Sequence, residues 1–120
     1  MPFEVTAEAI DRFAELTGDR NPIHLDVAAA SRYGGRVAHG LLTLSMVPPY
    51  LVERFGVGTI LVRVDSKFTR PVCIGDSLTI EGYSEIGAKG DRADIALTIA
   101  NQRGVSVAEV KAEVIKGGAP

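Results

Sequence analysis

A carboxylate, an amide and an imidazole occur within six residues of the chain, at Asp19, Asn21 and His24. Pro22 stands among them, and because proline lacks an N–H and restricts the residue before it, a regular helix through the whole segment is excluded. A compact turn would bring Asp19 and His24 to one point, where they could hold a water and exchange protons with it. Asn-Pro sequences also mark ordinary turns and helix N-caps, so this motif alone does not establish chemistry.

A second motif, Ala38-His39-Gly40, opens a long apolar segment with helical spacing. The N-terminus of a helix offers free backbone N–H groups and the positive end of the helix dipole, and both suit a developing oxyanion. The Gly40 N–H is therefore a candidate donor to a carbonyl oxygen. An acid–base pair with an oxyanion donor is sufficient for chemistry beside a carbonyl group, so we expect no cofactor.

Together these motifs resemble the MaoC-like family of (R)-specific enoyl-thioester hydratases and dehydratases. The resemblance rests on D-x-N-P-x-H at residues 19–24, on Ala38-His39-Gly40, and on Lys67–Val72 followed by Ile74-Gly75-Asp76. It implies reversible syn addition of water to a trans-2-enoyl thioester, which gives the (R)-3-hydroxyacyl thioester. The implied substrate is an acyl-CoA or acyl-carrier-protein thioester.

The resemblance also implies a role for each residue of the site. Asp19 and His24 would hold the catalytic water, with Asp19 as principal base and His24 as proton donor, while the Gly40 N–H would stabilise the thioester oxyanion. Asn21 would orient the turn or the water. His39 would fix the start of the helix by hydrogen bonding, and a third acid–base group is not required. Asp19, His24 and His39 show no paired ligand spacing, so we expect no metal site.

Two further sets of residues bear on substrate binding. Some family members carry a serine nine residues beyond the histidine of the His-Gly pair, where this chain has Pro48, and Ser45 one turn earlier is a candidate substitute. Pro48 puts the preference for acyl chain length in doubt. Four basic residues could meet the phosphates of a coenzyme A or phosphopantetheine arm, although scattered surface charge is the default for each: Arg32, Arg36, Lys67 and Arg70.

The first half of the chain has the signals of helices. Thr6 is a predicted N-cap and Gly18 a predicted C-cap of a first helix. Asp26–Tyr33 reads as a short second helix. Gly40–Phe55 is the principal helix, apolar on much of its surface, and Pro48-Pro49 should kink it or divide it into two.

Apolar residues then alternate, which predicts strands. The alternating runs cover Ile60–Phe68, Leu78–Gly82, Ala93–Ile99 and Val105–Val114, with a phase shift at 107–108 that suggests a bulge, turns at Gly87–Gly90 and Asn101–Gly104, and a loose tail at Gly117–Pro120. Helices followed by an antiparallel meander make an α+β protein. The resemblance sharpens this to a hot-dog fold, with the sheet wrapped around the central helix, and implies a homodimer joined edge to edge.

Composition limits the remaining possibilities. The 120 residues form one domain, residues 1–120, and the net charge of −2 predicts no general attraction to nucleic acid or to an anionic membrane. No signal-type segment or apolar run of spanning length is present, which favours a cytoplasmic protein. Cys73 is the single cysteine, expected to be a small buried hydrophobe, so no intrachain disulfide is possible.

Three other functions remain open. A biosynthetic dehydratase acting on a carrier-bound or unusual hydroxyacyl substrate would use the same residues. A hot-dog thioesterase would place a carboxylate on or near the central helix, and Gly40–Leu51 contains neither Asp nor Glu. A non-catalytic acyl-thioester-binding partner subunit would have no physical need for both Asp19 and His24.

Overall fold

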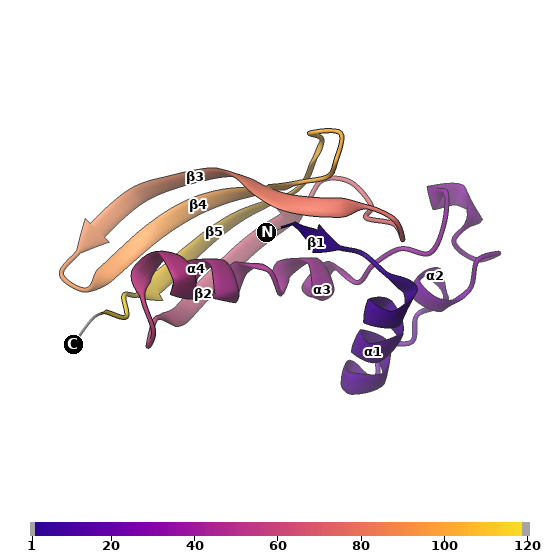
Figure 1. Ribbon diagram of the computed structural model, residues 1–120, viewed down its shortest axis with the longest axis horizontal. Coiled ribbons are helices and arrows are strands. Elements are labelled where there is room, and N and C mark those ends of the chain that lie inside the picture. The colour runs from indigo at the N-terminus through magenta and orange to yellow at the C-terminus, as the bar shows by residue number, and fades with distance from the viewer. Residues whose placement is uncertain (1, 119–120) are drawn as a thin grey trace.

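A curved antiparallel sheet arches over two consecutive helices, α3 and α4, and further helices lie beyond one end of the sheet (Figure 1). The computed structural model describes residues 2–118 of the chain. Its elements in chain order are β1 (Phe3–Glu4), α1 (Ala7–Thr17), α2 (Pro22–Leu25), the 3-10 turn η1 (Ser31–Tyr33), α3 (Gly40–Leu44), α4 (Val47–Phe55), β2 (Ile60–Phe68), β3 (Ser77–Lys89), β4 (Arg92–Ala100) and β5 (Ser106–Ile115). This is the predicted α+β hot-dog fold.

The five strands lie in the order β1-β3-β4-β5-β2, and each neighbouring pair is antiparallel. Alternate residues of the central strand β4, namely Ile95, Leu97 and Ile99, are almost fully buried in the core. Such alternation is expected where one face of an antiparallel sheet is covered and the other is not. The core therefore lies between the sheet and the helices α3 and α4.

The predicted break in the last strand is a β-bulge. Ile99 lies opposite Ala108, whereas the next residue of β4, Ala100, lies opposite Ser106. Val107 is thus the extra residue, and both Val107 and Ala108 are fully buried. A bulge allows two consecutive residues to face the core and increases the local bend of the strand, which explains the adjacent apolar residues.

The first helix begins and ends where the sequence predicts. The Thr6 hydroxyl accepts a hydrogen bond from the Ala9 N–H at 3.0 Å, and the Gly18 N–H donates to the Ala14 carbonyl at 2.8 Å. Gly18 has a φ of 80°, a conformation that costs a residue with a side chain far more than it costs glycine. The chain leaves α1 at Gly18, and Asp19 follows at once.

The central helix is divided in two, as predicted. α3 ends at Leu44 and α4 begins at Val47, so the break lies before Pro48 and Pro49 rather than at them. Both prolines occupy the first turn of α4, where the missing N–H has no helical acceptor to lose. The prolines therefore begin the second helix instead of kinking a continuous one.

Three expectations about local structure were wrong. Val27–Ala30 forms turns and only Ser31–Tyr33 is helical, as the 3-10 turn η1. Ala30 is the one fully buried residue of this stretch, which leaves a helix with almost no face to pack. Gly87–Lys89 belongs to β3, and the turn lies at 90–91. The described part of the tail is tied down, because the Gly117 N–H donates to the Thr59 hydroxyl at 2.9 Å; residues 119–120 lie outside the described range.

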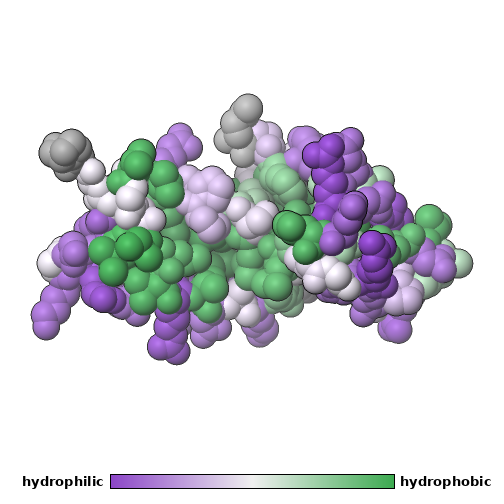
Figure 2. All heavy atoms as spheres, turned by 90° about the horizontal axis from the view of Figure 1, so that it is seen from below, coloured by the Kyte–Doolittle hydropathy of each residue, from purple (hydrophilic) through white to green (hydrophobic). Residues whose placement is uncertain are grey.

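Apolar side chains also gather on the face that carries the helices and β2, where Figure 2 shows hydrophobic patches. β2 is an edge strand, which within residues 2–118 pairs with β5 alone, and four of its apolar residues are exposed: Ile60, Val62, Val64 and Phe68. None of the helices in residues 2–118 is long and apolar enough to cross a membrane.

Candidate active site

The turn that carries Asp19 is built from side chain–backbone hydrogen bonds. The Asp19 carboxylate accepts from the Asn21 N–H at 3.3 Å, and the Asn21 side-chain oxygen accepts from the Ile23 N–H at 3.2 Å. Asn21 is thereby the N-cap of α2, whose first residue is Pro22. Proline at this position is favoured, because its fixed φ suits the helix and its absent N–H is not missed. The proline therefore starts a short helix, and His24 lies on that helix rather than in an irregular turn.

His24 is buried and its ring is held from one side. Nδ1 lies 2.7 Å from the Val37 carbonyl oxygen. Because a carbonyl oxygen only accepts, Nδ1 carries the proton, and Nε2 is the ring atom left for chemistry. The adjacent Val37 N–H donates to the Ile23 carbonyl at 2.9 Å, so the segment before α3 runs alongside α2 and anchors the imidazole.

Asp19 and His24 converge as the motif predicts. The Asp19 Oδ2 and His24 Nε2 atoms are 3.9 Å apart. That separation is too long for a direct hydrogen bond and suits one bridging oxygen atom. The side chain of Asp19 is 53% exposed and that of His24 is 9% exposed. The pair therefore offers an open carboxylate facing an imidazole that is embedded in the protein.

His39 lies behind this pair. Its Nε2 is 2.9 Å from the backbone carbonyl oxygen of Asp19, and its ring stacks on that of His24, with centroids 3.8 Å apart and planes 25° apart. The residue is 2% exposed. The predicted hydrogen bond of His39 thus exists, but it holds the turn of Asp19 rather than the first residue of α3.

Asp19, His24 and His39 could be taken for a metal site, since a donor atom of each lies within 4.8 Å of the others. A metal-binding imidazole directs the in-plane lone pair of its nitrogen at the ion. The rings of His24 and His39 are stacked 3.8 Å apart with planes only 25° from parallel, so their in-plane lone pairs lie in two separate, nearly parallel planes. A tetrahedral ion needs ligands that converge, so this donor set suits one poorly.

Gly40 lines a cavity of about 430 Å³ together with His24. It is the first residue of α3, and no acceptor for its N–H is found among residues 2–118. A Cβ at Gly40 would lie 2.6 Å from Cζ of Phe68, so any larger residue here would force the Phe68 ring to move. α3 has only five residues, which makes its dipole small, and the N–H itself is the group of interest.

A hydroxyl that sequence reasoning missed belongs to this cavity. Thr43 lines it, three residues after Gly40, on the same side of α3. Ser45 does not: its hydroxyl donates to the Leu42 carbonyl, and its residue lines a separate cavity of about 590 Å³ beside α4, β1 and β3. The i, i+3 spacing from Gly40 was the signal that would have found Thr43. The other lining residues of the first cavity are Ile23, Tyr33, Val37, Ala38, Phe68, Thr69, Arg70, Pro71 and Val72.

The basic residues are divided between different surroundings. Arg36 is engaged inside the protein, where its Nε donates to the His24 carbonyl at 2.7 Å and its guanidinium pairs with the Asp11 carboxylate. Lys67 lines a hollow formed by β2–β5 that the first cavity does not share, and the Arg32 guanidinium lies 5.3 Å from the Tyr33 ring centroid. Of the four predicted basic residues, Arg70 alone lines the cavity of His24.

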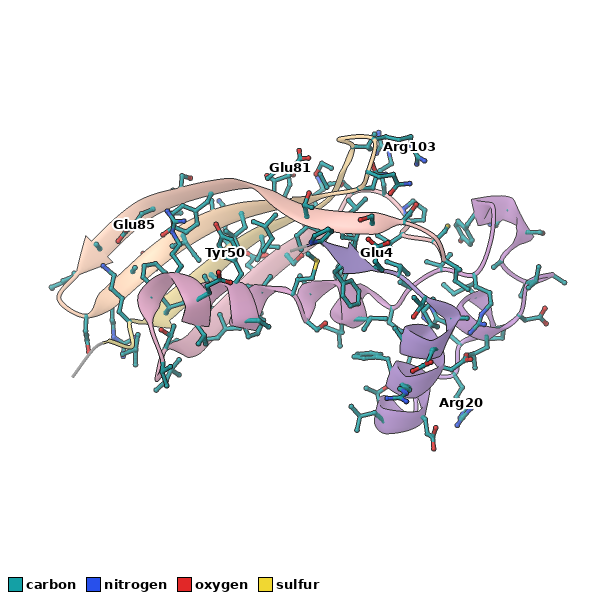
Figure 3. The ribbon with its side chains drawn as sticks, in the orientation of Figure 1. Glu4, Arg20, Tyr50, Glu81, Glu85 and Arg103 are labelled. Carbon is teal, nitrogen blue, oxygen red and sulfur yellow. The ribbon has the colours of Figure 1, made fainter. Side chains whose placement is uncertain are left out.

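A neighbouring hollow of about 550 Å³ shares Tyr33, Arg70 and Pro71 with that cavity, and it adds Arg103, which sequence reasoning missed. Figure 3 shows Arg103 at the turn between β4 and β5. Cys73 also lines this hollow and is only partly buried, contrary to expectation. Burial raises the pKa of the Cys73 thiol, the charge of Asp76 raises it further, and Arg103 opposes them.

Comparison with known proteins identifies the family of the chain. Residues 1–114 match the family model described as MaoC like domain. The chain is 37% identical over 99 residues to a 3-hydroxybutyryl-CoA dehydratase of Methylorubrum extorquens, a match that covers 79% of this chain and 63% of that protein. It is 40% identical over 70 residues to an (R)-specific enoyl-CoA hydratase of Rhodospirillum rubrum, which covers 56% of this chain and 49% of that protein.

A solved structure extends the likeness to nearly the whole chain. The unliganded R-hydratase of Pseudomonas aeruginosa superposes with a TM-score of 0.89 and 31% identity, covering 99% of this chain and 79% of that one. The matched family model, the relatives and the shared fold lead to one conclusion: the chain belongs to the family of MaoC-like domains.

Proposed function

We propose that the chain catalyses the reversible syn hydration of trans-2-enoyl thioesters to (R)-3-hydroxyacyl thioesters. The observation that carries this proposal is the 3.9 Å gap between Asp19 Oδ2 and His24 Nε2, which suits a single water between a base and an acid. Gly40 supports it, because this residue lines the cavity of His24 and no acceptor for its N–H is found among residues 2–118, while the reaction builds negative charge on a carbonyl oxygen.

The chemistry follows from the hydrogen bonds of the two side chains. Asp19 takes a proton from the bound water as the water oxygen bonds to C3 of the enoyl group. The C2–C3 π electrons move toward the thioester carbonyl, and His24 gives the proton on Nε2 to C2 as the carbonyl re-forms. Because Nδ1 is bonded to the Val37 carbonyl, the donor is the doubly protonated ring. Asp19 then holds one proton more and His24 one fewer, and a proton transfer through water restores both.

The same residues run the reaction in the direction of dehydration. The names of the relatives include both a dehydratase and a hydratase. His24 then removes the C2 proton, and protonated Asp19 donates to the leaving hydroxyl. A biosynthetic dehydratase is therefore the second candidate, and a comparison of coenzyme A and carrier-protein thioesters as substrates separates the two.

The thioester carrier is proposed to pass over Tyr33, Arg70 and Pro71, which belong to both the catalytic cavity and its neighbour. Arg103 lies at the far part of this path and has no carboxylate partner among the described residues. Phosphates of coenzyme A would contact the guanidiniums of Arg70 and Arg103. Arg103→Gln should raise KM for crotonyl-CoA and leave KM for crotonyl-pantetheine, which lacks the coenzyme's nucleotide and its phosphates, unchanged. An equal effect on both substrates would contradict this path.

A homodimer formed through the edge of β2 completes the proposal. The apolar row Val62, Val64 and Phe68 is exposed on that strand after the bulge between Leu61 and Arg63, and Phe68 also lines the catalytic cavity. A second copy would cover the row and close the cavity against water. Val62→Lys combined with Val64→Lys should convert a dimer to a monomer in light scattering and lower activity. A wild-type monomer with full activity would overturn this part.

The oxyanion role of Gly40 needs a test that separates the N–H from the space it occupies. Proline is accepted at the first helical position, and His39 has φ −60° and ψ 138°, which suits a residue before proline. In a Phe68→Ala background, which makes room, Gly40→Pro should lower kcat/KM by about 100- to 1,000-fold relative to Gly40→Ala. Equal rates in the two variants would remove the N–H from the mechanism.

The direct test is to incubate the purified protein with crotonyl-CoA and follow the loss of enoyl absorbance. We expect turnover and a product of (R) configuration, identified by chiral analysis of the released acid. Absence of turnover with both coenzyme A and carrier-protein thioesters would favour the non-catalytic subunit, and an (S) product would contradict the proposed geometry.

A further inference from the structure

We infer that His39 is a positioning residue that holds both members of the catalytic pair, an inference that rests on the function proposed above. His39 does not line the cavity, and its ring is almost fully buried. It nevertheless contacts Asp19 through its Nε2 and His24 through the stacked faces of the two rings. It is placed to act on the reaction only through those two residues.

The hydrogen bond of His39 determines where its proton lies. The Asp19 carbonyl oxygen is an acceptor, so Nε2 carries the proton and Nδ1 carries the lone pair. Nδ1 is buried and has no hydrogen-bond partner among residues 2–118. A buried polar atom without a partner is unfavourable, and an apolar ring would fill this space without that penalty. Packing alone therefore does not explain a histidine here, whereas the bond to Asp19 does.

Asp19 needs such a bond because its other hydrogen bonds reach only to near neighbours in the chain, including the 3.3 Å bond that its carboxylate accepts from the Asn21 N–H. It follows the left-handed Gly18, and its carboxylate is more than half exposed. Its N–H donates to the Thr17 hydroxyl at 3.2 Å, and its carbonyl accepts from His39. These two bonds hold the peptide groups on both sides of Cα, and the bond from the Asn21 N–H holds the carboxylate itself. The bond from His39 thus fixes the backbone from which the carboxylate projects.

His24 depends on the stack in a different way. The bond from Nδ1 to the Val37 carbonyl holds one edge of the ring but allows rotation about that bond. The face of His39, 3.8 Å away between centroids, blocks that rotation on one side. Phe13 supports His39 in turn, with ring centroids 4.9 Å apart. Nε2 of His24 is therefore aimed at the gap beside Asp19 by two contacts made in different directions.

Two substitutions of His39 separate these contacts. His39→Phe keeps an aromatic ring against His24, loses the bond to Asp19, and removes the unpartnered Nδ1. His39→Gln keeps a donor for the Asp19 carbonyl and loses the stacked ring. A control for core damage is Ile99→Val, a buried residue of β4 outside the cavity.

We expect the thermal midpoint of His39→Phe to equal or exceed that of the wild type, while kcat for crotonyl-CoA hydration falls about 10- to 100-fold and KM stays within about twofold. His39→Gln should lose less of kcat than His39→Phe. Ile99→Val should lose stability and keep wild-type activity per folded molecule. A histidine that served packing alone would make activity follow stability in all three variants.

A folded His39→Phe variant with wild-type kcat overturns the inference. If His39→Phe does not fold, a folded His39→Gln variant with wild-type kcat overturns it instead. A second measurement is independent of turnover. The NMR resonances of the Asp19 amide and the His24 ring should shift or broaden in His39→Phe and stay in place in Ile99→Val. Wild-type protein without turnover would defeat the proposed function, whereas unchanged resonances in His39→Phe would defeat the positioning role.

Discussion

The two halves of the molecule are held together in different ways. From β2 onward, long antiparallel ladders join the strands, and β4 and β5 supply many of the residues of the apolar core. Around Asp19 and His24, by contrast, single side chains tie segments that are far apart in the chain, such as Arg36 to His24 and His39 to Asp19. A change in the sheet should therefore cost stability, and a change in the site region should cost geometry and rate.

The largest expected effect is on rate, at the pair itself. Asp19→Asn and His24→Ala should each lower kcat for crotonyl-CoA by about 100- to 10,000-fold, because each removes a positioned acid or base. The fold should persist, since neither side chain belongs to the apolar core. Circular dichroism and steady-state kinetics on the same samples test this. Near-wild-type turnover in either folded variant would remove the pair from the mechanism.

The opposite effect should come from the sheet. Ile95 is fully buried in β4, and Ile95→Ala should lower the free energy of unfolding by about 2–5 kcal/mol through lost burial and a cavity. Activity per folded molecule should stay within about twofold. Urea unfolding followed by kinetics at a temperature where the variant is folded measures both. A specific loss of kcat in Ile95→Ala would erase the distinction between the two halves.

Substitution of Arg36 should affect both rate and stability, because Arg36 links α1 to the backbone of His24. Arg36→Met removes the donor to the His24 carbonyl and the pair with Asp11, so kcat should fall about 10- to 100-fold with a moderate loss of stability. Arg36→Lys should recover only part of the rate, since lysine cannot reproduce both bonds. The matched control is Arg12→Ala, which breaks the exposed pair with Glu8 and should change neither property. Equal kinetics in Arg36→Met and Arg12→Ala would contradict the link.

The smallest expected effect is on the alkylation rate of Cys73, which lines the hollow next to the catalytic cavity. Its pKa is raised, chiefly by burial, so at a given pH the folded protein holds less thiolate than a free cysteine does. Alkylation by iodoacetamide at pH 8 should be slower than in the unfolded protein and should accelerate as the pH rises. Binding of a thioester over Tyr33 and Arg70 should slow it further. Reaction as fast as that of the unfolded chain would show that the thiol is more accessible than its surroundings indicate.

Much of the fold was readable from the amino-acid sequence. Alternation located four strands, the phase shift at 107–108 located the bulge, and Thr6 and Gly18 marked both ends of α1. These signals are local, because a few neighbouring residues determine a helix cap or the buried face of a strand. The convergence of Asp19 and His24 was predictable for the same reason. The two residues are only five positions apart, and Pro22 between them limits the conformations of the chain.

The tertiary structure determined the contacts between residues that are distant in the sequence. The bond from Arg36 to His24 spans 12 residues and that from His39 to Asp19 spans 20, and neither spacing follows a helix or strand period. The ring of Phe68 against Gly40 and the turning of Ser45 away from the cavity are likewise products of packing. Local sequence specifies the elements and the reactive groups, whereas the aim of those groups depends on side chains that only folding brings beside them.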